Sequence, residues 1–178
     1  MWRMLAQIAR VGIISEPPPP PSAAAATQHL QQRIAQLFGR ALNIRHVDAG
    51  SCNGCELEIQ ALNNPLYNLE GLGIRFVASP RHADLLLVTG PVARNMRAAL
   101  LRTYEATPDP KLVVALGECG CTGGIFGESY ASCGPVSSVL PVDASISGCP
   151  PSPQRILAGI LAAIAARTPT RLSRHARS

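Results

Sequence analysis

Aromatic and charged residues are both scarce in this chain. Phe, Tyr and Trp make up 4% of the 178 residues, and Asp, Glu, Lys and Arg make up 15%. Aliphatic residues dominate instead, as they do in α/β proteins whose parallel strands are buried on both faces. The length suits one domain with a sizeable core and is short for two.

The sequence also lacks a hydrophobic run long enough to cross a bilayer. The longest uninterrupted apolar run is Ile156–Ala166, whereas a membrane-spanning helix needs about 20 residues. No secretion signal is convincing, because Arg10 interrupts the N-terminal apolar stretch and no small-residue cleavage site follows it directly. There is no twin-arginine pair either. We therefore expect a cytoplasmic protein.

Motifs for nucleotide binding and for nucleophilic catalysis are missing. The stretch GECGCTGG lacks the Gly-Lys-Ser/Thr ending of a phosphate-binding loop, and no Gly-x-Gly-x-x-Gly follows the first expected strand. No cysteine–histidine nucleophile pair can be recognised in the sequence, and the position of His46 on a strand is typical of a packed or edge histidine. These absences disfavour a nucleotide-dependent enzyme or a thiol hydrolase.

The C-terminal tail lacks acidic residues. The net charge of +5 comes largely from arginine, and four arginines lie within residues 167–178. Such a tail suits nucleic acid or an acidic membrane surface. Because it has no interleaved aromatic residue and no nucleic-acid-binding motif, a solvated tail is favoured and no nucleic-acid partner is expected.

Strand and helix signals alternate through the body of the chain. Strands are expected at Asn43–Asp48, Ile74–Ser79, Ala83–Gly90, Lys111–Gly117 and Ser138–Asp143, and helices at 55–64, 94–106 and 152–167. Ser152 is the expected N-cap of the last helix, with Pro153 in its first turn. This order predicts a largely parallel sheet with helices on both faces.

An amphipathic helix on a proline-rich arm is expected at residues 1–22. Apolar residues recur at helical spacing over Met1–Val11, and EPPPPPS then stops the helix and forms a stiff spacer. The helix either docks on a partner or membrane surface or is a frayed terminus. A second helix is expected at 23–38, within an α/β domain that spans 23–167, and a basic tail follows at 168–178.

Six cysteines in a reducing compartment indicate metal or redox chemistry rather than a disulfide framework. Cys52 and Cys55 follow the first expected strand, Cys119 and Cys121 the fourth, and Cys149 the fifth. Sites in open α/β sheets form outside the carboxyl ends of strands, so three loops would bring these thiols to one edge. Four thiolates there fit a 4Fe–4S cluster or a tetrahedral zinc ion, and a thiol redox pair is a third alternative.

The residues themselves favour the cluster. Only Cys52 and Cys55 form a tight pair, whereas zinc ribbons typically use two such pairs. The dipeptide Cys149-Pro150 is a familiar setting for iron–sulfur ligands. Glycines near these cysteines would let the backbone approach a bulky inorganic core: Gly50, Gly54, Gly117, Gly120, Gly123, Gly124 and Gly148.

Within about 43–161 the chain resembles one known family, through HVDAGSCNGCELEI, ASPRHADLLLVTGPV, GECGCTGGIFGESY, VLPVD and SGCPPSP. These motifs are similar to those of the iron–sulfur small subunit shared by complex I, as its 20 kDa or B subunit, and by membrane-bound energy-converting nickel–iron hydrogenases of the formate hydrogenlyase type. The resemblance implies a flavodoxin-like fold. It also implies packing against a large subunit that holds a nickel–iron centre or part of a quinone cavity.

The resemblance further implies a ligand set. Cys52, Cys55, Cys119 and Cys149 are the implied ligands of one 4Fe–4S cluster, with Cys119 at the single cysteine of the family's glycine-rich pattern. Cys121 lies where the family requires no cysteine and is expected to be a packed thiol or a spare ligand. Cys133 is expected to be a small buried hydrophobe.

The pattern Cys52-x-x-Cys55 resembles the hydrogenase branch, since complex I members carry two adjacent cysteines there. We expect a single-cluster electron relay in a membrane-associated nickel–iron hydrogenase, peripheral on the inner face of the membrane. Expected partners are the large subunit, a ferredoxin-like subunit and membrane-arm subunits. Glu56 and Glu58 are candidates for tuning the potential or relaying protons, or else are ordinary helix-start acids. A complex I-like quinone reductase subunit and a zinc-stabilised scaffold or assembly protein are the alternatives.

Overall fold

The structure is a computed structural model that describes residues 2, 6, 9–10, 41–67 and 69–166. The predicted arm at 1–22 lies largely outside these residues, and the predicted helix at 23–38 and tail at 168–178 lie entirely outside them. What the sequence indicates about those segments therefore stays a prediction.

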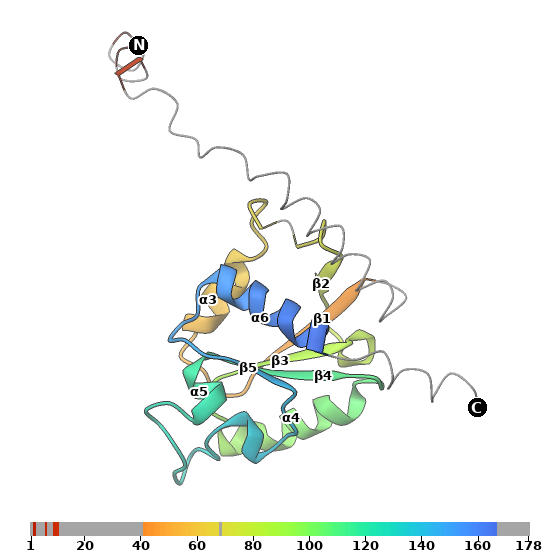
Figure 1. The fold of residues 1–178 in the computed structure, drawn as a ribbon. Coiled ribbons are helices and arrows are strands. Elements are labelled where there is room, and N and C mark those ends of the chain that lie inside the picture. The colour runs from red at the N-terminus through yellow and green to blue at the C-terminus, as the bar shows by residue number, and fades with distance from the viewer. Residues whose placement is uncertain (1, 3–5, 7–8, 11–40, 68, 167–178) are drawn as a thin grey trace, which may run out of the picture.

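A five-stranded parallel sheet forms the centre of the described part (Figure 1). The strands are β1 (Leu42–Asp48), β2 (Ile74–Phe76), β3 (Leu85–Thr89), β4 (Leu112–Leu116) and β5 (Ala144–Ile146). Their order across the sheet is β2-β1-β3-β4-β5, and all neighbours are parallel. This is the order of flavodoxin-like folds, so the predicted fold class is confirmed.

Helices cover both faces of the sheet. They are α3 (Gly54–Ala61), α4 (Arg94–Ala106), α5 (Gly117–Thr122) and α6 (Pro153–Ala166), with 3-10 turns η1 (Pro80–His82) and η2 (Val136–Ser138). Figure 1 shows α3 and α6 on one side of the sheet and α4 on the other. Pro153 begins α6 as expected, and the Ser152 carbonyl accepts the first helical hydrogen bond.

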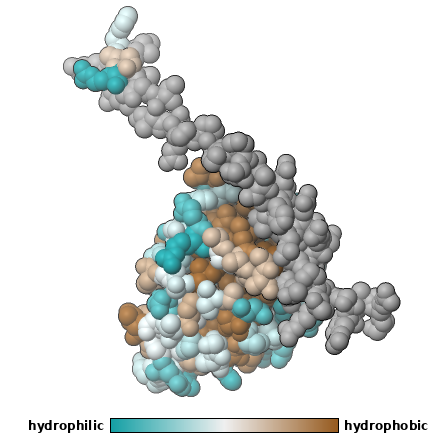
Figure 2. Space-filling view, viewed as in Figure 1, coloured by the Kyte–Doolittle hydropathy of each residue, from teal (hydrophilic) through white to brown (hydrophobic). Residues whose placement is uncertain are grey.

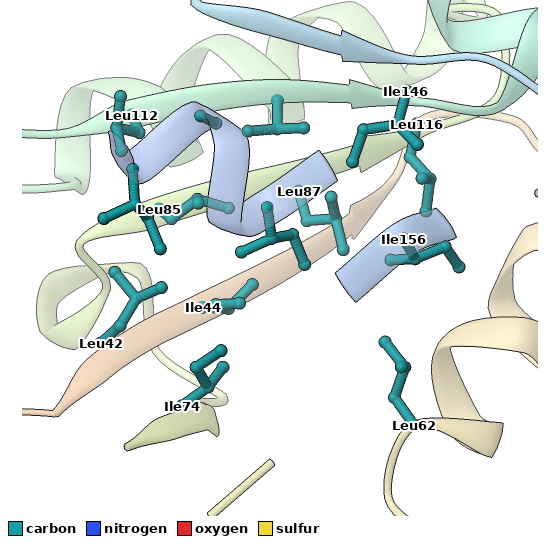
Figure 3. Close-up of a cluster of buried hydrophobic side chains, with 14 of the residues drawn as sticks. Leu42, Ile44, Leu62, Ile74, Leu85, Leu87, Leu112, Leu116, Ile146 and Ile156 are labelled. Atoms are coloured by element: carbon teal, nitrogen blue, oxygen red, sulfur yellow. The ribbon is translucent and has the colours of Figure 1, made fainter. Parts of the chain in front are cut away.

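The hydrophobic core lies in two layers, one on each face of the sheet. Every residue of β3 and β4 is buried. Leu85 and Leu87 pack in the layer under α3 and α6 (Figure 3), whereas Leu86 and Val88 pack in the layer under α4. This alternation follows from the two-residue period of a strand. Each fully buried aliphatic side chain contributes about 1.5–3 kcal/mol, which explains why so few polar residues interrupt these strands.

The last strand was predicted in the wrong place. The expected strand Ser138–Asp143 is absent, and β5 begins at Ala144 instead. Pro141 cannot donate a ladder hydrogen bond. The Asp143 carboxylate meanwhile accepts a 2.8 Å hydrogen bond from the Val113 backbone, so a side chain takes the place of a ladder bond. The shift places the strand end closer to Cys149.

A second correction concerns GECGCTGG, for which the sequence predicts a strand end at Gly117 followed by a loop. Its first six residues form α5, which begins directly where β4 ends.

None of the helices described here is long and apolar enough to cross a membrane. Figure 2, in the same view as Figure 1, shows apolar surface interspersed with polar surface over the body of the molecule.

Candidate functional site: the cysteine edge

The first two cysteines lie where β1 leads into α3. The Asp48 carboxylate accepts hydrogen bonds from the backbone N–H groups of Gly50 (2.8 Å) and Ser51 (2.7 Å), which closes a tight turn after the strand. Cys52 follows this turn and is exposed, and Cys55 lies in the first turn of α3 and is partly buried. The turn therefore holds both thiols at the carboxyl edge of the sheet.

Cys119 and Cys121 both lie on α5 but face different directions. Residues two apart on a helix are about 200° apart around its axis. Cys119 Sγ lies beside Gly124, where an added Cβ would come within 2.8 Å of it. Cys121 Sγ instead donates a long hydrogen bond (3.7 Å) to the Ala115 carbonyl and packs against the core layer under α4.

Cys149 reaches the same edge from the loop after β5. It is exposed, and the carbonyl of the preceding Gly148 accepts a 2.8 Å hydrogen bond from the Glu118 backbone. This bond ties the loop to the first turn of α5. An added Cβ on Gly117 would lie 2.6 Å from Cys55 Sγ and 3.6 Å from the Gly148 carbonyl oxygen. Gly117 is therefore the point at which the three cysteine-bearing segments meet.

The pKa values show which thiols lie together. Burial raises the pKa of Cys55 to about 12, with further contributions from Glu56 and then from Cys52, Cys119 and Cys149. The pKa of Cys119 is also raised, first by burial and then by Cys149 and Cys52. These four thiols therefore lie within electrostatic reach of one another. We call the edge that carries Cys52, Cys55, Cys119 and Cys149 the cysteine edge.

Cys121 and Cys133 lie apart from this group. Burial raises the pKa of Cys121. A hydrogen bond with Ser145 lowers this pKa and Glu118 raises it, and no other cysteine contributes. Cys133 is partly buried and packs against the core layer under α4. Within the described ranges, no three His, Cys, Asp or Glu side chains come close enough together to hold one metal ion.

Glu56, directly after Cys55, is buried in a hydrogen-bonded network. Ser51 Oγ donates to Glu56 Oε2 at 2.5 Å, and Thr89 Oγ1 donates to Glu56 Oε1. His46 Nε2 lies 3.0 Å from Thr89 Oγ1 and 3.5 Å from Glu56 Oε1. Burial lowers the pKa of His46, and the neighbouring carboxylate only partly opposes this.

Sequence reasoning missed part of this network. It singled out Glu56 and Glu58, but Glu58 is partly exposed, and the residues that bond Glu56 are Ser51 and Thr89. A signal was available, because a polar residue that ends an otherwise apolar strand needs a partner when it is buried. The role of Glu56 and Glu58 in tuning a potential or relaying protons stays a prediction.

The cysteine edge fits an iron–sulfur cluster. Cysteine thiolates are the usual protein ligands of such clusters. Gly117 and Gly124 leave open the spaces beside Cys55 Sγ and Cys119 Sγ that a Cβ would fill. Both glycines have positive φ, 82° and 55°, which other residues rarely adopt. Backbone therefore approaches the thiols from two sides without side chains in the way.

Comparison with known proteins identifies the family. The profile of the family described as "NADH ubiquinone oxidoreductase, 20 Kd subunit" matches residues 52–163, which include all four cysteines of the edge. The chain belongs to this family. Members of the family are iron–sulfur subunits of oxidoreductases, which confirms the resemblance seen in the sequence.

Several relatives are subunits of multisubunit enzymes. The chain is 46% identical over 140 residues to a probable membrane-bound hydrogenase subunit of Pyrococcus furiosus, covering 77% of this chain and 84% of that protein. It is 47% identical over 125 residues to formate hydrogenlyase subunit 7 of Escherichia coli, covering 70% of this chain and 49% of that protein. The B subunit of the NADH-quinone oxidoreductase of Desulfovibrio desulfuricans is 40% identical over 125 residues, covering 70% of this chain and 67% of that protein.

Solved structures agree with the fold. A chain of the membrane-bound sulfane sulfur reductase, an archaeal respiratory membrane complex, matches with a TM-score of 0.63 and 34% identity over 76% of this chain and 74% of that chain. A chain of an NAD⁺-reducing [NiFe]-hydrogenase matches with a TM-score of 0.56 and 19% identity, covering 73% of this chain and 94% of that chain. The second likeness supports the flavodoxin-like fold alone.

Proposed function

We propose that this protein is the single-cluster 4Fe–4S electron-transfer subunit of a multisubunit, membrane-associated nickel–iron hydrogenase related to complex I. The observation that carries the proposal is the convergence of Cys52, Cys55, Cys119 and Cys149 from three segments onto one edge of the sheet. When bound, the cluster supplies one-electron transfer. The chain is an oxidoreductase subunit that acts only in complex with its large subunit.

Four residues are proposed as the ligands, each as a thiolate. Cys52 and Cys149 are exposed, whereas Cys55 and Cys119 are partly buried, so one side of the group is open and the other rests on protein. Ligand thiols must be deprotonated to bind iron, so assembly at Cys55 releases a proton despite its raised pKa. The pKa values of Cys55 and Cys119 are raised in part by other cysteines, and those cysteines all belong to this group of four, which supports one cluster.

The partners proposed for this chain follow from its surface and its relatives. Leu57, Ile125 and Phe126 are large apolar side chains that are more than half exposed. Leu57 lies two residues after Cys55, and Ile125 follows Gly124, which borders Cys119. Exposed apolar groups at a site mark an interaction surface. We propose that the large subunit docks on this apolar surface. A ferredoxin-like subunit and membrane-arm subunits would bind elsewhere on the chain, and the complex would lie on the inner face of the membrane.

A complex I-like quinone reductase subunit is the second candidate. Relatives that are NADH-quinone oxidoreductase B subunits favour it, whereas the Cys52-x-x-Cys55 spacing and the relatives in hydrogenases favour the first candidate. The sequence of the large subunit that purifies with this chain discriminates between them. Four nickel-binding cysteines in that subunit support the hydrogenase, and their absence supports the quinone reductase.

The test of the cluster itself is anaerobic reconstitution of the full chain with iron and sulfide. A brown product with four irons and four sulfides per chain, and an electron paramagnetic resonance signal on reduction, supports the proposal. A colourless product with one zinc ion per chain overturns it in favour of a zinc-stabilised scaffold or assembly protein. Hydrogen turnover by the isolated chain would also contradict an electron-relay role.

A further inference from the structure

The segment that carries Cys52 and Cys55 is joined to the sheet by a continuous chain of hydrogen bonds. Ser51 Oγ accepts a 3.0 Å hydrogen bond from the Asn53 backbone N–H and donates its own proton to Glu56 Oε2. Glu56 Oε1 accepts the proton of Thr89 Oγ1. Because a hydroxyl has one proton, His46 Nε2–H is then the donor to Thr89 Oγ1.

This arrangement differs from an ordinary helix start. Glu56 is the third residue of α3, where a glutamate usually reaches back to the N-cap backbone N–H. Here Ser51 Oγ accepts the hydrogen bond from that N–H, which belongs to Asn53, and donates its own proton to one carboxylate oxygen of Glu56. The other oxygen is thereby free to bond Thr89, the last residue of β3. A solvated helix-start acid would need neither partner, yet Glu56 is only 9% exposed.

We propose that Glu56 is the positioning residue of the cysteine edge: through Ser51 and Thr89 its carboxylate fixes the Cys52–Cys55 segment against the end of β3. Both cysteines then lie at a set distance from Cys119, which is in α5, and from Cys149, which is in the loop after β5. The cost of burying a carboxylate is offset only when its oxygens are hydrogen-bonded, so the network and the position of the segment depend on each other. The inference rests on the proposed function, since it concerns the group that the four thiols hold.

The test uses the full chain reconstituted anaerobically with iron and sulfide. Thr89→Val removes the hydroxyl at nearly constant volume, Thr89→Ser retains it, and Glu56→Gln keeps the shape while removing the charge. Glu105→Gln is the matched control, because it makes the same chemical change at an exposed site in α4, on the other side of the sheet from α3. Circular dichroism and thermal unfolding establish that each variant is folded.

Two properties are measured: the rate at which a chelator removes iron, and the electron paramagnetic resonance spectrum of the reduced protein. Removing a group that orients metal ligands typically weakens metal binding 10–100-fold. We therefore expect Thr89→Val and Glu56→Gln to lose iron at least about tenfold faster than the wild type, with a shifted spectrum. Thr89→Ser and Glu105→Gln should match the wild type in both properties.

The outcomes separate this inference from the proposed function. If the wild type binds no iron, the proposed function fails and the inference fails with it. If the wild type binds four irons and Thr89→Val and Glu56→Gln leave both properties unchanged, the inference alone is overturned. It is likewise overturned if Glu105→Gln has effects as large as Glu56→Gln. Should Glu56→Gln not fold, the contrast between Thr89→Val and Thr89→Ser decides the question.

Discussion

Gly117 and Cys55 come so close together that a Cβ added to Gly117 would lie 2.6 Å from Cys55 Sγ. Gly117 begins α5 and Cys55 lies in α3, so the contact joins two segments more than sixty residues apart in sequence. Real Cβ atoms are essentially never found at such a distance, and the φ of 82° disfavours any side chain there as well. The close approach of the two segments therefore requires glycine.

Gly117→Ala should displace Cys55 and impair assembly of the site. A left-handed backbone conformation costs a non-glycine residue about 1–2 kcal/mol, and the clash with sulfur adds to this cost. We expect fewer than four irons per chain after reconstitution and at least about tenfold faster iron loss. Gly127→Ala is the matched control, because its φ is also positive at 51° but an added Cβ would meet nothing within 4 Å. Equal iron content in the two variants would contradict the prediction.

Cys119→Ser should lose most of the cluster, whereas Cys121→Ser and Cys133→Ser should retain four irons per chain. Cys119 is coupled electrostatically to Cys149 and Cys52, but Cys121 points toward Ala115 on the other side of α5. A serine oxygen is a poor substitute for the thiolate that the fourth iron needs. Iron and sulfide analysis of the three variants checks this. The assignment is wrong if iron survives in Cys119→Ser and falls in Cys121→Ser.

The apo protein should show an unreactive Cys55. A pKa of about 12 leaves roughly a thousandth of the thiolate that an ordinary thiol has at pH 8, and the higher nucleophilicity of a more basic thiolate recovers part of the difference. We expect iodoacetamide to modify Cys55 roughly 30-fold more slowly than in the unfolded chain. Peptide mass spectrometry over time measures the rate, with the urea-denatured protein as the reference. Equal rates in folded and denatured protein would argue against a buried, coupled thiol.

His46 should make the stability of the apo protein depend on pH. Burial lowers its pKa below the ordinary value of 6.5, so near that pH the unfolded state binds more protons than the folded state. The stabilisation is present above pH 6.5 and is lost as the pH falls through the lowered pKa. We expect the free energy of unfolding to decrease from pH 7 to pH 5, and to decrease less steeply in His46→Gln. Denaturant titrations at each pH test this, and parallel curves for the two proteins would refute it.

Much of the fold could be predicted from the sequence. The apolar runs of β3 and β4 have no alternating polar residues, and this predicts strands covered on both faces. The prediction of α4 agrees residue for residue with the structure, because its periodicity is strong. The last strand was misplaced, because the apolar pattern near Pro141 did not reveal that Asp143 would bond the backbone of β4 with its side chain.

For the site, the sequence alone determined which residue types were available and in which order. Cysteines after strand ends, the Cys52-x-x-Cys55 spacing and the glycines beside them depend only on chain order, since parallel strands present their carboxyl ends at one edge. Only the tertiary structure decided which cysteines share that edge. The helical turn of α5 directs Cys119 and Cys121 to opposite sides. Glu56 accepts a hydrogen bond from Thr89 only because the start of α3 lies beside the end of β3. Such pairings depend on how distant segments pack, which local pattern does not specify.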